Sequence, residues 1–211
     1  MLIPNEVVGL LEKAAASRRF GDMRLLRFGN TIDEKLQTQF AALCIVIGDG
    51  SFYISFRGTD DTLVGWKENF NMGFMDSVPA QLLAAQYTEA AARAIRGKIR
   101  IGGHSKGGNL AEYAALTAAP EVQQRIARLY NHDGPGFKAG LFTAADYEPL
   151  AGRMTKQVPA DSMVGILMGS FMPVEVVQAT GRGFEQHSVF RWVVEGADGE
   201  AGRSNAEGAR D

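Results

Sequence analysis

Apolar residues recur along the chain with two periods, one typical of strands and one typical of helices. Two β-rich runs, at 40–47 and 51–56, are joined by Gly48-Asp49-Gly50, which predicts an antiparallel hairpin. Further short apolar runs predict strands at 98–101, 126–131, 153–158, 174–178 and 188–194.

Helical patterns separate these strands. Apolar side chains at helical spacing predict helices at 6–16, 79–97, 109–118 and 144–150, whereas 57–79 breaks the strand pattern and is expected to be a loop. Strands that alternate with helices favour an α/β fold with a mainly parallel sheet and helices on both faces. We therefore expect a parallel sheet opened by an N-terminal antiparallel hairpin.

The composition fits one globular domain. The chain has 211 residues, of which 45% are hydrophobic, so a single domain over 1–195 is expected, followed by a flexible tail over 196–211. The first 19 residues do not resemble a secretory signal and no apolar run reaches membrane-spanning length, so we expect a cytoplasmic location.

Charge and cysteine content exclude several classes of site. The formal net charge of −2 gives no basic excess for nucleic acid, which makes nucleic-acid partners unexpected. Cys44 is the only cysteine and stands in an apolar run, typical of a core thiol. Because one cysteine and three scattered histidines give no ligand spacing, we expect neither a metal nor a cofactor.

The segment from Ile99 to Leu110 carries the strongest chemical signal. Gly103, Ser105 and Gly107 fit the Gly-x-Ser-x-Gly pattern of a nucleophile elbow, a sharp strand-to-helix turn with an exposed serine hydroxyl. The context agrees, since a β-like run precedes the pattern and an alanine-rich helical run follows it. A glycine-rich turn without catalytic function is the simpler interpretation. The pattern in this context favours Ser105 as a nucleophile.

A serine nucleophile needs a base, and histidine is the usual one. His104 adjoins Ser105 in the elbow, so its side chain should diverge from the serine. His132 follows too closely for an acid to come between on another strand, whereas His187 leaves room for the order serine, acid, histidine. His187 is therefore the predicted base.

Two aspartates compete for the acid. Asp161 follows the strand predicted at 153–158 and should lie at the sheet edge that carries the elbow. Asp133 ends the preceding predicted strand. We favour Asp161 and keep Asp133 as the alternative acid; a turn carboxylate that caps a loop is the simpler interpretation of either.

An oxyanion hole needs two donors aimed at the developing charge. One is the amide of Lys106, the residue after the serine. The loop after an early strand should supply the other, and Thr59 in the 56–59 loop offers both an amide and a hydroxyl. A tight turn without this role is the alternative.

These residues together resemble a known family. Phe56-Arg57-Gly58-Thr59 followed by Trp66, and then Gly103-His104-Ser105-Lys106-Gly107-Gly108-Asn109-Leu110-Ala111, resemble the class 3 (fungal-type) lipases of the α/β-hydrolase fold. The resemblance extends over about residues 40–195. It implies Ser105, Asp161 and His187 as a triad, with Thr59 and Lys106 as oxyanion donors.

Further strings are more specific. Trp66-Lys67-Glu68-Asn69-Phe70-Asn71-Met72, Tyr130-Asn131-His132-Asp133-Gly134-Pro135-Gly136-Phe137, and Gln186-His187 with Trp192 resemble a poorly characterised bacterial lipase-like family of the same fold. Lys106 departs from the usual leucine and puts a cation beside the nucleophile. That charge should favour substrates with an anionic group near the scissile carbonyl.

The leading hypothesis is a serine hydrolase that cleaves a small-molecule or lipid-like carboxylic ester or thioester through an acyl-enzyme. The alternative is a hydrolase fold used as a binding or regulatory module with little turnover. Acyl transfer and peptide hydrolysis stay open, because the same triad catalyses them.

Overall fold

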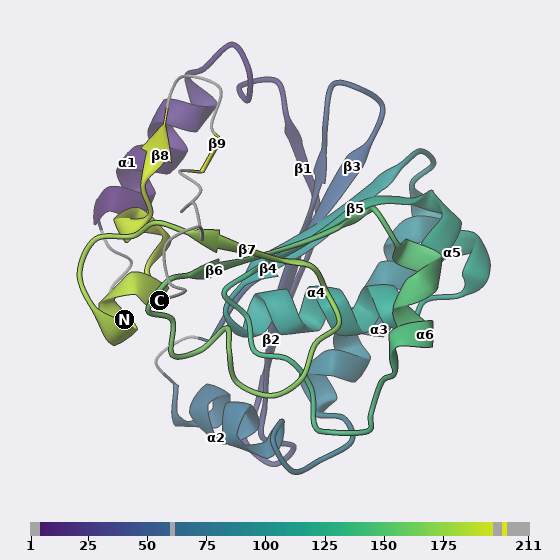
Figure 1. Ribbon diagram of the computed structural model, residues 1–211. Helices are drawn as coiled ribbons and strands as arrows, with labels where there is room; N and C mark the ends of the chain where they lie inside the picture. The colour runs from purple at the N-terminus through teal and green to yellow at the C-terminus, as the bar shows by residue number, and fades with distance from the viewer. Residues whose placement is uncertain (1–4, 60–61, 196–199, 202–211) are drawn as a thin grey trace.

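A seven-stranded sheet runs through the molecule in the spatial order β1-β2-β3-β4-β5-β6-β7 (Figure 1). The computed structural model describes residues 5–59, 62–195 and 200–201. β1, β2 and β3 pair antiparallel and β3 to β7 pair parallel. The strands are β1 (Arg24–Asp33), β2 (Thr38–Val46), β3 (Phe52–Phe56), β4 (Ile99–His104), β5 (Ile126–His132), β6 (Met154–Pro159) and β7 (Val174–Val177).

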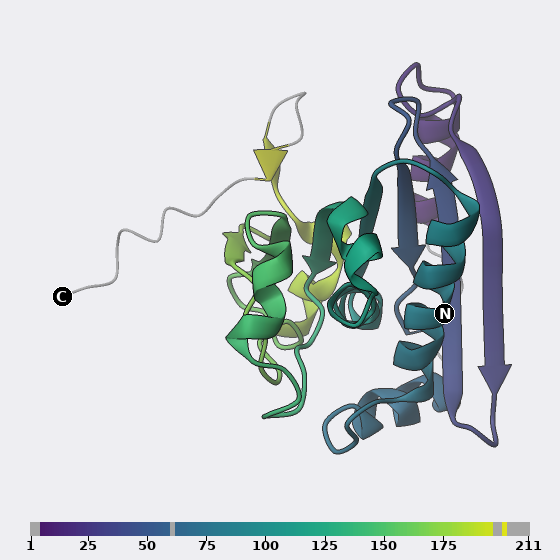
Figure 2. The same cartoon turned by 90° about the vertical axis from the view of Figure 1, so that its right-hand side faces the viewer.

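The two faces of this sheet are covered unequally. The long helices α3 (Pro79–Ala94) and α4 (Lys106–Leu116) pack on one face, and α1 (Asn5–Ala15) lies on the other side of the sheet (Figures 1 and 2). The shorter helical elements are α2 (Leu63–Asn71), α5 (Pro120–Arg125), α6 (Ala144–Tyr147), η1 (Glu148–Leu150), η2 (Gly183–His187) and η3 (Val189–Arg191). This is the α/β-hydrolase fold expected from the sequence.

The core lies between the sheet and α3 and α4. Alternate residues of β3 and β4 point into it, among them the fully buried Ile54 and Ile101. Small side chains such as Ala84 and Ala114 let the two helices approach the sheet closely. Cys44 is buried here as expected, and burial raises the pKa of its thiol to about 11.

The hairpin and the parallel strands are confirmed, whereas three elements differ from the prediction. β1 was not predicted, because its side chains are exposed on both faces and give no alternation. The expected loop contains α2, which begins at an N-cap: the Thr62 hydroxyl accepts a hydrogen bond from the Gly65 amide. The last predicted strand is wrong, since Val189–Arg191 forms a 3₁₀ turn and only Val194–Glu195 forms a strand, β8.

The expected tail lies mainly outside the described residues, which omit 196–199 and 202–211. The two residues of it that are described, Glu200–Ala201, form β9 and pair antiparallel with β8. In the described part of the chain, the helices are all too short or too polar to cross a membrane.

Candidate active site

The turn from β4 into α4 has the geometry of a nucleophile elbow. Ser105 takes the strained backbone angles φ 57° and ψ −132°. A Cβ at Gly103 would lie 2.5 Å from the Gly107 carbonyl, and one at Gly107 would collide with the Phe56 carbonyl. Both glycines are therefore required by close packing of the backbone around the serine.

The loop after β3 passes directly beside this elbow. A Cβ at Gly58 would lie 3.4 Å from the Cβ of Ser105. The hydroxyl of Thr59 lies 2.7 Å from Nδ2 and 2.9 Å from Oδ1 of Asn69 in α2. Because the Thr59 hydroxyl is hydrogen-bonded to Asn69, the backbone amide of Thr59 is the group that remains available to a substrate oxygen.

His187 is paired with a buried carboxylate. Nδ1 of His187 lies 2.7 Å from Oδ2 of Asp133, whose side chain is fully buried, while the imidazole keeps 15% exposure. With Nδ1 hydrogen-bonded to a carboxylate, Nε2 is the nitrogen left to accept a proton. Within the described residues, the Ser105 hydroxyl makes no hydrogen bond to this imidazole, a bond that often tightens only when substrate binds.

Both carboxylate oxygens of Asp133 have hydrogen-bond partners. It follows β5 at a positive φ of 51°. Its Oδ1 accepts hydrogen bonds from the Ser162 hydroxyl at 2.5 Å and from the Gly165 amide at 3.0 Å. The carboxylate therefore has one oxygen tied to the loop after β6 and the other directed at His187, a geometry that fixes the orientation of the imidazole.

Beneath this aspartate lies a buried polar network. Glu112 of α4 accepts hydrogen bonds from Asn131 at 2.6 Å, Tyr147 at 2.7 Å and Ser170 at 2.6 Å. Asn131 in turn accepts one from the Gly134 amide at 2.8 Å. The network therefore fixes Asn131 and Gly134, the residues directly before and after His132 and Asp133.

The preference for Asp161 over Asp133 is at odds with this geometry. The Asp161 side chain is exposed, and its Oδ2 accepts a hydrogen bond from the Gly183 amide at 2.5 Å. The reason is strand order: β5, which leads to Asp133, pairs directly with β4 and the elbow, whereas β6 is one strand further away. Asp161 instead anchors the start of η2, the turn that ends at His187.

The other two histidines lie near the site, apart from the predicted base His187. His104 Nε2 lies 2.7 Å from the His187 carbonyl oxygen, and the two rings are 4.5 Å apart. Burial, and secondly the nearby charge of His187, lower the pKa of His104 to about 4. His104 is thus neutral near pH 7 and braces the backbone of His187. The backbone carbonyl of His132 accepts a hydrogen bond from the backbone amide of Ser105 at 2.9 Å.

The expectation of a cation that faces the substrate is wrong. The Lys106 side chain is only 1% exposed and its ammonium donates to the Gln39 carbonyl at 2.6 Å and to Glu68 Oε2 at 2.8 Å. The positive charge is therefore compensated inside the protein. The backbone of Lys106 still begins α4 directly after Ser105, where the amide of an oxyanion hole belongs.

Two carboxylates of this region were missed as positioning groups. Glu68 is fully buried between α2, β2 and α3, and Glu112 is fully buried under Asn131. The signal for Glu68 is weak, because α2 itself was expected to be a loop. Glu112 stands in an alanine-rich helix among small residues. A charged residue in such a helix indicates a buried carboxylate that is hydrogen-bonded to other buried groups.

Within residues 5–59, 62–195 and 200–201, no three His, Cys, Asp or Glu side chains are grouped so that they could hold a metal ion.

Comparison with known proteins agrees with this fold. A family model described as Mbeg1-like matches residues 14–209. Among solved structures, the crystal structure of M37 lipase superposes with a TM-score of 0.53 at 15% sequence identity, over 78% of this chain and 64% of the lipase chain. The chain thus spans less than two thirds of that lipase. No curated protein sequence matches the chain.

Proposed function

Since the chain belongs to the Mbeg1-like family and shares the fold of a lipase, we propose that it is a serine hydrolase that cleaves carboxylic esters or thioesters. The observation that carries the proposal is the 2.7 Å contact between His187 Nδ1 and the buried Asp133, beside a serine in a strained elbow. We assign Ser105 as nucleophile, His187 as base and Asp133 as the orienting acid. The chain order serine, acid, histidine is the order of α/β-hydrolases.

The first half of the reaction forms an acyl-enzyme. Oγ of Ser105 attacks the carbonyl carbon of the ester while its proton passes to Nε2 of His187. The Asp133 carboxylate stabilises the imidazolium that results. The carbon–oxygen bond to the alcohol then breaks, and the alcohol leaves with the proton from Nε2.

Water completes the cycle. His187 removes a proton from a water molecule, the hydroxide attacks the acyl carbon, and the bond to Oγ of Ser105 breaks as the proton returns to that oxygen. The carboxylic acid leaves. Throughout both halves, the amides of Lys106 and Thr59 are the proposed donors to the oxygen that becomes negative.

The packing around the two proposed donors supports this assignment. Gly58 brings the 56–59 loop against the Cβ of Ser105, and Asn69 fixes the Thr59 side chain. The Lys106 amide is fixed by the start of α4. Donors held in this way cost no reorganisation when charge develops, which is why such a site accelerates acyl transfer.

Turnover of short-chain p-nitrophenyl esters tests the proposal. The wild-type protein should release p-nitrophenol above the uncatalysed rate, and both Ser105→Ala and His187→Ala should lower kcat/KM by about 10³-fold or more. The matched control is Ser188→Ala, an exposed serine next to His187, which should keep wild-type activity. Turnover that survives Ser105→Ala would overturn the proposal, and a folded wild type without turnover would favour the binding-module alternative.

A further inference from the structure

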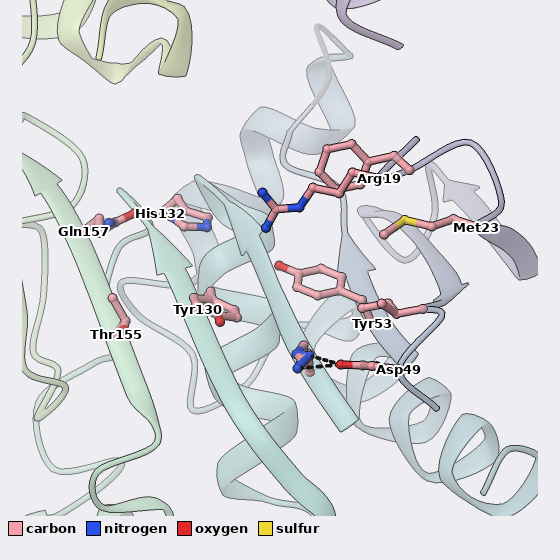
Figure 3. Close-up of a pocket in the computed structure, with 11 residues that line it drawn as sticks. Arg19, Met23, Asp49, Tyr53, Tyr130, His132, Thr155 and Gln157 are labelled. Carbon is pink, nitrogen blue, oxygen red and sulfur yellow. Dashed lines mark hydrogen bonds and ion pairs between the residues drawn. The ribbon is translucent and has the colours of Figure 1, made fainter. Parts of the chain in front are cut away.

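A hollow of about 600 Å³ lies on the face of the sheet opposite α3 and α4. Its floor is formed by strand residues that alternate with the buried core positions, among them Tyr53, Tyr130 and His132 (Figure 3). The turn after α1 contributes Arg19 and Met23 to its wall. The volume falls in the range of about 300–1,000 Å³ that small-molecule sites occupy.

The floor presents a row of nearly parallel rings. The rings of Tyr53 and Tyr130 are 6.3 Å apart with an angle of 24°, and those of Tyr130 and His132 are 6.0 Å apart with an angle of 13°. Gly102 on the intervening strand makes this possible, since a Cβ there would collide with the Tyr53 hydroxyl and lie 2.9 Å from the Cβ of Tyr130. The row forms a surface along which the planar apolar part of a ligand can lie.

Two hydroxyl groups at this surface are available as hydrogen-bond donors as far as the described residues go. Among the described residues, neither phenol hydroxyl of the row has a hydrogen-bond partner. Burial raises the pKa of Tyr53, so its hydroxyl keeps its proton and serves as a donor. Nδ1 of His132 is already engaged, 3.0 Å from the side-chain oxygen of Gln157.

Among the residues that the structure describes, one positive charge of the hollow has no ion-pair partner. Arg100 is paired with Asp49 at 3.0 Å, which cancels its charge. The guanidinium of Arg19 extends over the floor toward the Tyr53 hydroxyl (Figure 3) and makes no ion pair with a described carboxylate. Its described contact is with the Phe20 ring, 5.3 Å from the guanidinium carbon to the ring centroid.

We propose that this hollow binds a small organic carboxylate with a flat apolar body. The carboxylate accepts hydrogen bonds from the Arg19 guanidinium and the Tyr53 hydroxyl, a charge-assisted geometry that guanidinium groups favour. The apolar body lies along the ring of Tyr130, with Phe20 and Met23 on its other side. This proposal stands independently of the hydrolase assignment, because none of these residues belongs to the proposed triad or oxyanion hole.

Titration calorimetry with 2-naphthoate tests the proposal on the full chain. The neutral 2-naphthamide has the same body without the charge. Arg19→Gln removes the cation, Tyr53→Phe removes one hydroxyl and keeps the ring, and Arg18→Gln is the matched control, an exposed arginine of the same turn outside the hollow. Ser105→Ala distinguishes this hollow from the candidate active site, because the substitution should change the affinity for a carboxylate that binds in the candidate active site.

Wild type should bind 2-naphthoate saturably at one site. Arg19→Gln should weaken binding at least about tenfold and Tyr53→Phe about threefold, with Arg18→Gln and Ser105→Ala within about twofold of wild type. The amide should bind at least about tenfold more weakly than the carboxylate. Absence of saturable binding, equal binding of the amide, or equal effects of Arg19→Gln and Arg18→Gln would each overturn the proposal.

Discussion

The ammonium of Lys106 lies 2.8 Å from the carboxylate of Glu68, and both side chains are closed off from solvent at 1% and 0% exposure. The Glu68 carboxylate also accepts hydrogen bonds from the backbone amides of Gln39 and Ala80, each at 2.9 Å. The pair thus ties the residue after the nucleophile to β2, α2 and the start of α3. Since α2 also carries Asn69, the same pair positions the loop of the second proposed oxyanion donor.

Removal of one partner should be costly. Lys106→Met leaves the Glu68 carboxylate buried without its counter-ion, which we expect to lower the free energy of unfolding by about 3–5 kcal/mol. The double variant Lys106→Met/Glu68→Gln removes both charges and keeps an acceptor oxygen for the buried amides, so it should recover part of that loss. Urea unfolding followed by circular dichroism measures the difference.

Lys138→Met is the control for this experiment. Lys138 pairs with Asp76 at the same distance of 2.8 Å, but both side chains are exposed, so its removal should cost less than about 1 kcal/mol. A Lys106→Met variant no less stable than Lys138→Met would contradict the structural role of the buried pair.

The internal pairing of Lys106 also has a consequence for substrate choice. Because Glu68 compensates the charge, the double variant should leave the ratio of kcat/KM for an anionic ester over a neutral ester within about twofold of wild type. Mono-4-nitrophenyl succinate and 4-nitrophenyl butyrate are a suitable pair. A ratio that falls tenfold would mean that the ammonium acts on the substrate.

Stability should depend on pH through His104. Its pKa is about 4 in the folded protein and about 6.5 in an unfolded chain. Between these values the unfolded chain binds a proton that the native protein does not, so stability falls as the pH falls from 6.5 to 4, by about 1.4 kcal/mol per pH unit at most.

The variant His104→Gln keeps a donor for the His187 carbonyl and removes the titration. Its free energy of unfolding, measured at pH 7 and pH 5, should change less than that of wild type. Burial also lowers the pKa of His132, so part of the pH dependence should persist in the variant. Equal pH dependence of His104→Gln and wild type would contradict the low pKa of His104.

Much of the fold was predictable from local sequence. The apolar alternation of β3 and the turn at Gly48–Gly50 reflect burial on one face, which the pattern records directly. β1 was not predictable in this way because it is an edge strand with exposed side chains on both faces. α2 was missed because its exposed side carries Leu63, Trp66 and Phe70, which hide the helical alternation of apolar and polar residues.

The elbow glycines make a further prediction about packing. Gly107→Ala should destabilise the protein by about 2 kcal/mol or more, since its Cβ would meet the backbone carbonyl of Phe56, which cannot rotate away. Gly48→Ala is the matched control, a glycine with open space around it and without a positive φ. Thermal unfolding of the two variants makes the comparison, and similar losses would contradict the close approach at the elbow.

The candidate site was predictable where one motif specifies it and not where several chain segments meet. The proposed nucleophile Ser105 and the proposed donor amide of Lys106 follow from the elbow alone, and the proposed base His187 follows from its distance along the chain. The proposed acid does not, because Asp133 and Asp161 both follow strands that end at the same sheet edge. The strand order and the path of η2 decide which carboxylate meets His187, and neither is encoded in local spacing.

The rate at which a fluorophosphonate probe labels Ser105 tests the central claim most directly. Wild type should be labelled and Ser105→Ala should not. Asp133→Asn should slow labelling by about 10²–10⁴-fold, because the imidazole loses the carboxylate that sets its tautomer, while Asp161→Asn should stay within about threefold of wild type. Slow labelling of Asp161→Asn beside normal labelling of Asp133→Asn, or no labelling of folded wild type, would contradict a triad of Ser105, Asp133 and His187.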